Sequence, residues 1–203
     1  MSEVEHVQPG HLLSEREATL RTRALESLLL EKGVLADGAV DAVAGIYEND
    51  VGPLIGARVT AHAWVDPAFK ARLLADGGRA VKELGITGIE GDHLVVLENT
   101  RDVHNVVVCT LCSCYPWALL GLPPRWYKSY AYRSRVVIEP RTVLRELGLD
   151  VPESVEIRVW DSSSDMRYMV LPERPARTEA LGEAELAELV TREAMIGIAT
   201  VST

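Results

Sequence analysis

The stretch Asn105-Val-Val-Val-Cys-Thr-Leu-Cys-Ser-Cys114 is a β-branched run, typical of a strand, that leads directly into a cluster of cysteines. Cys109, Cys112 and Cys114 are the three cysteines of the 203-residue chain. An odd number of thiols this close together cannot form the disulfide framework of a secreted protein. Three soft sulfur donors in one loop can converge on a single metal ion. The spacing therefore predicts metal or redox chemistry in a loop that follows a short strand.

Several arrangements of these thiols are open. A structural zinc site with His104 as fourth ligand is conceivable, although zinc ligands usually come from two separated pairs. A thioredoxin-like pair of Cys109 and Cys112 is disfavoured because a strand, rather than a helix N-terminus, adjoins it. In a third arrangement, the thiolates of Cys112 and Cys114 and the amides of Ser113 and Cys114 lie in one plane around the metal. Cys109 then binds from below, and one face stays open for water or substrate. Because deprotonated amides need a strongly polarising ion, this arrangement favours a trivalent metal.

Residues 1–13 are predicted to be a mobile tail, and hydrophobic periodicity predicts helices over about residues 14–85. The expected helices are Glu15–Lys32, one that starts after Asp37 and runs to Asn49, Leu54–Trp64, Pro67 to the Asp76-Gly-Gly break, a shorter one to Gly85, Tyr130–Gly148 with a bend or restart at Pro140, and Glu183–Arg192.

Short apolar or alternating runs after Gly91 predict strands. These are His93–Glu98 and Asn105–Val108, then Val155–Trp160 and Met166–Leu171 as a β-hairpin, and a final extended segment, Ile196–Val201. Helices that precede strands predict an α+β fold.

Composition excludes several classes of function. The chain has 21 Lys and Arg against 30 Asp and Glu, a net charge of −9, which disfavours non-specific binding to nucleic acid. No apolar stretch approaches the roughly 20 residues of a transmembrane helix. The first residues lack the basic start and apolar core of a signal peptide. These features predict a cytoplasmic protein without a nucleic-acid or membrane partner.

The cysteine loop and its flanks resemble the α subunit of nitrile hydratase, and the resemblance extends from about Ser14 to Gly197. The segments that carry it are Tyr47–Glu48, Gly52–Pro53, Gly56–Arg58, Ala63–Pro67, Val108–Trp117, Leu120–Ser129, Tyr132–Val137, Ile157–Asp161, Arg167–Tyr168, Val170–Pro175 and Ile196–Gly197.

The resemblance implies a non-corrin Co(III) centre, or alternatively a non-haem Fe(III) centre, that hydrates a nitrile to an amide. Its ligands would be the sulfurs of Cys109, Cys112 and Cys114 and the backbone nitrogens of Ser113 and Cys114. Cys112 and Cys114 would be oxidised to sulfinic and sulfenic forms. Cys112, Ser113 and Cys114 are thus the predicted catalytic residues, and the sulfenate oxygen of Cys114 would act as base or nucleophile.

Further residues would line the pocket or hold the centre through hydrogen bonds: Glu90, Thr110, Tyr115, Trp117, Asp161, Asp165 and Arg167. Thr110 and Tyr115 resemble the cobalt branch of the family, so one cobalt ion per chain is predicted. Glu90 stands where relatives commonly carry Gln, and residues 177–182 depart from the family pattern. These differences affect the expected substrate range and the expected contact with a β subunit.

The resemblance also implies a helical N-terminal arm at residues 14–50, followed by a catalytic metal-binding domain at 51–203 that is an α/β-layered globular domain. It implies partners as well. They are a β subunit, as one chain or divided into two, that binds the helical arm in an αβ or higher assembly, a metallochaperone and a small nitrile. Residues 125–145 carry a local charge of +5, which fits either an intersubunit contact or a solvated helix face. Two other functions remain open: a thiocyanate hydrolase-type subunit, against which Trp117 argues, and a non-catalytic zinc-binding interaction module.

Overall fold

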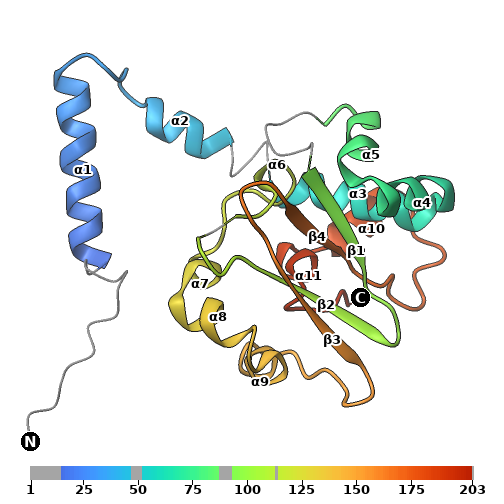
Figure 1. Ribbon diagram of the computed structural model, residues 1–203. Helices are drawn as coiled ribbons and strands as arrows, with labels where there is room; N and C mark the ends of the chain where they lie inside the picture. The colour runs from blue at the N-terminus through green and yellow to red at the C-terminus, as the bar shows by residue number, and fades with distance from the viewer. Residues whose placement is uncertain (1–14, 47–51, 87–92, 113, 203) are drawn as a thin grey trace, which may run out of the picture. The chain divides into compact units, whose positions relative to one another are not determined.

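A computed structural model describes residues 15–46, 52–86, 93–112 and 114–202 (Figure 1). The chain divides into two units, Met1–Ala44 and Gly45–Thr203. The first holds α1 (Glu15–Glu31) and most of α2 (Ala39–Gly45). The predicted continuation of the second helix to Asn49 lies partly outside the described residues. Leu20, Leu25 and Leu28 of α1 are each about half exposed.

The second unit begins with three helices at positions that the sequence predicts. They are α3 (Pro53–Val65), α4 (Pro67–Ala75) and α5 (Gly77–Glu83). A carboxylate oxygen of Asp66 accepts hydrogen bonds from the backbone N–H groups of Ala68 and Phe69, at 2.8 and 3.0 Å. Asp76 caps α5 in the same way. These caps satisfy backbone donors at the starts of α4 and α5, whereas α3 begins at Pro53 without a side-chain cap.

Two parallel strand pairs form the centre of this unit (Figure 1). β1 (Leu94–Glu98) pairs with β4 (Arg167–Leu171), and β2 (Val103–Val108) pairs with β3 (Glu156–Asp161). The predicted hairpin between the two later strands is therefore wrong. Alternation of polar and apolar residues indicates which face of a strand is buried, but it does not specify the partner strand. Most residues of β2 and β4 are buried, and such nearly continuous burial is typical of strands in parallel pairs.

Short helices cover the other parts of this unit. They are α6 (Trp117–Leu120), α7 (Arg125–Lys128), α8 (Tyr130–Arg135), α9 (Pro140–Glu146), α10 (Glu183–Leu189) and α11 (Arg192–Ile196). The predicted restart at Pro140 is confirmed, with proline in the first turn of α9. Helices α4 and α5 pack against β1, α11 packs against β4, and α9 packs against β3, while α3 packs against α4, α10 and α11. The mixture of helices and strands agrees with the predicted α+β class.

The C-terminal segment differs from its predicted extended form. Thr191 caps α11, accepting a hydrogen bond from the N–H of Ala194, and the helix continues to Ile196. Gly197 ends it with φ of 91°, and an added Cβ would lie 2.0 Å from the carbonyl oxygen of Asn105. Glycine is required here because a side chain would meet the backbone of β2.

A buried polar network joins this C-terminal turn to β1 and β2. Nε2 of His104 lies 2.7 Å from the carbonyl oxygen of Gly197, to which it donates, and Nδ1 lies 3.2 Å from the amide nitrogen of Asn99. The Asn99 oxygen accepts hydrogen bonds from the backbone and side chain of Asn105. Nδ1 must therefore accept from the Asn99 amide, which requires a neutral imidazole. Burial lowers the pKa of His104 accordingly.

Among the helices of the described residues, none is both long and apolar enough to cross a membrane.

Acidification should destabilise the fold through His104. Its pKa is lowered from an ordinary value of 6.5, so below about pH 6.5 the unfolded chain binds more protons than the folded chain. The free energy of unfolding should fall as the pH drops from 6.5 toward the lowered pKa. In thermal unfolding between pH 7.5 and 5, His104→Gln, which does not titrate, should lose less stability than the wild type. Equal slopes for both proteins would contradict this assignment.

Candidate metal centre

The parallel pairing of β2 with β3 places the start of the cysteine loop. Val108, the last residue of β2, lies opposite Asp161, the last residue of β3. Because the strands are parallel, their carboxyl ends meet at the same edge, and Cys109 emerges beside Asp161. The N–H of Ser162 donates to the carbonyl oxygen of Val108 at 2.7 Å, which extends the pairing past both strand ends.

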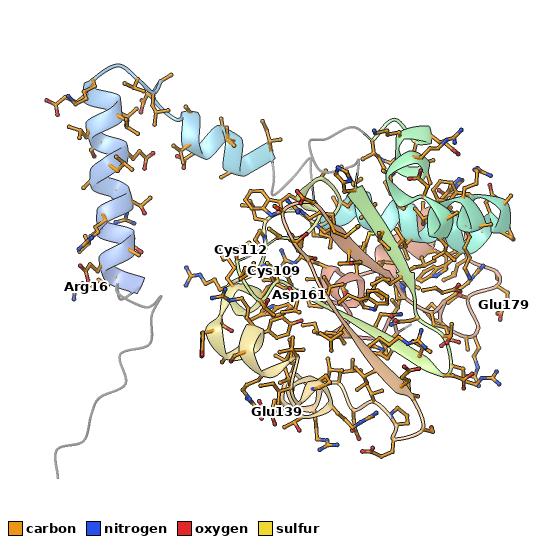
Figure 2. The ribbon with its side chains drawn as sticks, viewed as in Figure 1. Arg16, Cys109, Cys112, Glu139, Asp161 and Glu179 are labelled. Carbon is orange, nitrogen blue, oxygen red and sulfur yellow. The ribbon has the colours of Figure 1, made fainter. Side chains whose placement is uncertain are left out.

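The three thiols converge on one point. Their sulfur atoms all lie within 4.8 Å of one another, with 3.3 Å between Cys109 and Cys112 and 3.0 Å between Cys112 and Cys114. Cys109 is fully buried, Cys114 is half-buried and Cys112 is exposed. Figure 2 shows Cys109 and Cys112 close to Asp161. The cluster is thus anchored from inside the protein and open on the side of Cys112, while Ser113 lies outside the described residues.

Thr110 is tied to β3 by two hydrogen bonds. Its N–H donates to one carboxylate oxygen of Asp161 at 2.9 Å, and its hydroxyl donates to the other at 2.6 Å. A guanidinium nitrogen of Arg133 donates to the carbonyl oxygen of Thr110 at 3.3 Å. The loop is therefore held on both sides of its second residue.

Four aromatic residues form a cluster next to the loop: Tyr115, Trp126, Tyr127 and Tyr132 pack in pairs with ring centres 5.0–5.8 Å apart. The hydroxyl of Tyr127 donates to the carbonyl oxygen of Cys114 at 3.0 Å, and that of Tyr132 donates to Val107 at 2.7 Å. Apart from Tyr115, the residues of this aromatic cluster are absent from the predicted site. A concentration of aromatic residues at 126–132, in a chain with 5% aromatics, is the signal that could have revealed it.

The electrostatics of the cluster favour a bound cation. Burial and the neighbouring thiols of Cys112 and Cys109 raise the pKa of the Cys114 thiol to about 12, against the opposing charge of Arg167. Three adjacent thiolates therefore require a positive charge among them. Nε of Arg133 and Nε of Arg167 are buried and, among the described residues, have no hydrogen-bond acceptor. Soft donors around an open face, near arginine donors, fit a transition metal with anionic ligands.

The comparisons with known proteins agree with this geometry. The family model described as nitrile hydratase, alpha chain, matches residues 16–199. The chain belongs to the nitrile hydratase α-chain family. It is 60% identical over 185 residues to the cobalt-containing nitrile hydratase subunit alpha of Pseudonocardia thermophila, covering 91% of each chain. This confirms the predicted resemblance and the predicted enzyme class.

Two other relatives mark the range of the family. A solved structure of a double mutant of the Fe-type nitrile hydratase from Comamonas testosteroni Ni1 has a TM-score of 0.85 and 45% identity, covering 93% of this chain and 92% of that one. The thiocyanate hydrolase subunit gamma of Thiobacillus thioparus is 44% identical over 188 residues, covering 87% of this chain and 76% of the other. The fold is thus shared across nitrile hydratases and a thiocyanate hydrolase.

The structure places the remaining residues that the resemblance implies. Trp117 begins α6 and packs, half-buried, against the core. Arg167 begins β4, donates to the carbonyl oxygen of Ser163 and lies near Cys114. Asp165 is exposed and accepts a hydrogen bond from the hydroxyl of Ser164.

The other predicted residues are placed as follows. Tyr115 is buried, with its hydroxyl donating to the carbonyl oxygen of Leu120. Glu90, like Ser113, lies outside the described residues. His104, the conceivable fourth zinc ligand, has both ring nitrogens engaged with Asn99 and Gly197, so neither is directed to the cysteines.

Asp161→Asn should weaken the centre because an amide can accept only one of the two hydrogen bonds from Thr110. We expect metal affinity or turnover to fall on the order of tenfold, as for other residues that orient metal ligands. The measurement is steady-state turnover together with metal content. Glu156→Gln, the same chemical change at the opposite end of β3, serves as the matched control and should retain both. Equal behaviour of the two variants would contradict this role of Asp161.

Proposed function

We propose that this chain is the catalytic α subunit of a cobalt nitrile hydratase that converts a nitrile and water into the corresponding amide. The observation that carries the proposal is the convergence of three cysteine sulfurs within 4.8 Å at the carboxyl end of β2. Family membership supports the reaction, and the cobalt-containing relative supports the metal.

The proposed ligands are the sulfurs of Cys109, Cys112 and Cys114 and the backbone nitrogens of Ser113 and Cys114. Cobalt in its trivalent state would supply Lewis acidity toward the nitrile triple bond. Cys112 and Cys114 would carry added oxygen atoms as sulfinate and sulfenate. The exposure of Cys112 and partial exposure of Cys114, against full burial of Cys109, favour oxidation at these two sulfurs rather than at the third.

The side chains around the cluster have the following proposed roles. The sulfenate oxygen of Cys114 would take a proton from water or attack the nitrile carbon, on the open side of the cluster. Asp161 and Thr110 would keep Cys109 in place, and Arg167 would compensate negative charge near Cys114. The neutral Tyr127, whose phenol pKa burial raises well above its usual range, remains a hydrogen-bond donor throughout.

The proposed partner is a β subunit, as one chain or two, that contributes arginines and tyrosines to the pocket. The half-exposed leucines of α1 (Leu20, Leu25 and Leu28) suit an arm, predicted at residues 14–50, that binds this partner. The +5 charge of residues 125–145 is a second candidate contact. Several predictions from the sequence remain predictions. They are loading by a metallochaperone, a small nitrile as substrate, a cytoplasmic location and the lack of a nucleic-acid partner.

A thiocyanate hydrolase-type subunit is the second candidate function because a subunit of such an enzyme is 44% identical. Trp117 after the cysteine loop favours the nitrile. A zinc-binding interaction module is the third candidate, and the engagement of His104 elsewhere weakens its best fourth ligand.

Replacing Cys114 with Ser should abolish nitrile hydration because the variant lacks both a metal ligand and the proposed sulfenate. The assay uses the complex with its β partner, produced in cobalt medium, with a simple aliphatic nitrile and with thiocyanate as separate substrates. The wild-type complex should form amide from the nitrile and turn over thiocyanate far more slowly.

Wild-type complex produced without cobalt is the control for the metal, and it should be inactive while still containing both subunits. Full activity of Cys114→Ser would contradict the proposed mechanism. Faster turnover of thiocyanate than of the nitrile would assign the chain to the second candidate function.

A further inference from the structure

The backbone of the cysteine loop is held by one residue of α7 and one residue of α8, neither of which the resemblance places in the site. Tyr127 of α7 donates a hydrogen bond to the carbonyl oxygen of Cys114, where the loop ends. Arg133 of α8 donates to the carbonyl oxygen of Thr110, near its start. The segment that contains Cys112 therefore spans two anchored carbonyl groups.

The Tyr127 anchor is rigid. The side chain is fully buried, and its ring lies between those of Tyr115 and Tyr132, at 5.3 and 5.8 Å between centres. Trp126 packs against it edge to face, with ring centres 5.8 Å apart. A ring confined on several sides cannot follow a displaced loop, so its hydroxyl defines where the Cys114 carbonyl lies.

Arg133 and Asp161 hold different groups of the same residue, Thr110. The carboxylate holds the N–H and hydroxyl of Thr110, and the guanidinium holds its carbonyl oxygen, so the peptide groups on both sides of Thr110 are fixed. The bond from Arg133, at 3.3 Å, is longer than the 3.0 Å bond from Tyr127. We therefore expect the larger contribution from Tyr127.

We propose that Tyr127 and Arg133 are positioning residues that set the backbone geometry of the metal loop, an inference that rests on the proposed function of this loop. Fixing the Cys114 carbonyl fixes the orientation of that residue, and hence the direction of its Sγ and of its backbone nitrogen. Fixing Thr110 does the same beside Cys109. Both anchors belong to this chain, so they act before any contribution from a partner subunit.

The chain offers a matched pair of variants for the test. Tyr127→Phe and Tyr132→Phe each remove one hydroxyl from a buried ring of the same aromatic group, and each leaves a backbone carbonyl without that donor. Tyr127→Phe removes the donor to the carbonyl oxygen of Cys114, in the metal loop. Tyr132→Phe removes the donor to the carbonyl oxygen of Val107, in β2. A purely structural role predicts the same outcome for both variants.

The experiment uses the cobalt-loaded complex with its β partner and follows cobalt release to excess chelator, the visible absorption of the metal–thiolate centre, and kcat and KM. Tyr127→Phe should release cobalt on the order of ten times faster than the wild type. It should also shift the absorption spectrum and lower kcat with KM little changed. Tyr132→Phe should lower the melting temperature but retain the wild-type spectrum and release rate.

Arg133→Met provides a second test and decides the outcome if Tyr127→Phe fails to assemble. It should accelerate cobalt release, less than Tyr127→Phe does, and Arg133→Lys should recover part of the loss because it restores a cationic donor. The inference is overturned if Tyr127→Phe matches Tyr132→Phe, or if Arg133→Met matches the wild type, in release rate and spectrum. A wild-type complex without bound metal would overturn the proposed function and the inference with it.

Discussion

The parallel register of β2 and β3 determines how the rest of the site is built. It sets Val108 opposite Asp161 and so brings the first cysteine of the loop beside a carboxylate from a segment distant in the sequence. An antiparallel pairing would place the end of β3 at the other end of β2. The two hydrogen bonds from Thr110 to Asp161, at 2.9 and 2.6 Å, depend on this register. Every later feature of the loop starts from that fixed point.

The loop combines a buried start with an exposed middle. Full burial of Cys109 anchors one sulfur in the core, while Cys112 faces outward, and the cluster therefore presents an open side. Burial also makes the neutral thiol favourable at Cys114, whose pKa is raised to about 12. The cluster is thus stable as thiolates only with a cation between them. We infer that Tyr127 and Arg133, through the carbonyl groups of Cys114 and Thr110, hold the loop backbone in the geometry that such a cation needs.

Much of this arrangement was predictable from local chemistry. Asp66, with Pro67 after it, marks a helix start, and six residues with three thiols mark the metal loop, because capping and ligand spacing act within a few residues. Strand partners were not predictable. The alternation at 155–160 and 166–171 predicts a hairpin, but these strands pair with β2 and β1 instead. The roles of Tyr127 and Arg133 also escaped prediction, since their contacts to Cys114 and Thr110 depend on tertiary packing.

The proposed centre is one cobalt ion held by this loop, with two of the cysteines oxidised. The most direct measurement is the metal content of the complex with its β partner, together with the mass of the tryptic peptide Asp102–Arg125, which contains the whole loop. The account predicts about one cobalt per chain, with two oxygens added at Cys112 and one at Cys114. Zinc bound to three unmodified cysteines would contradict it.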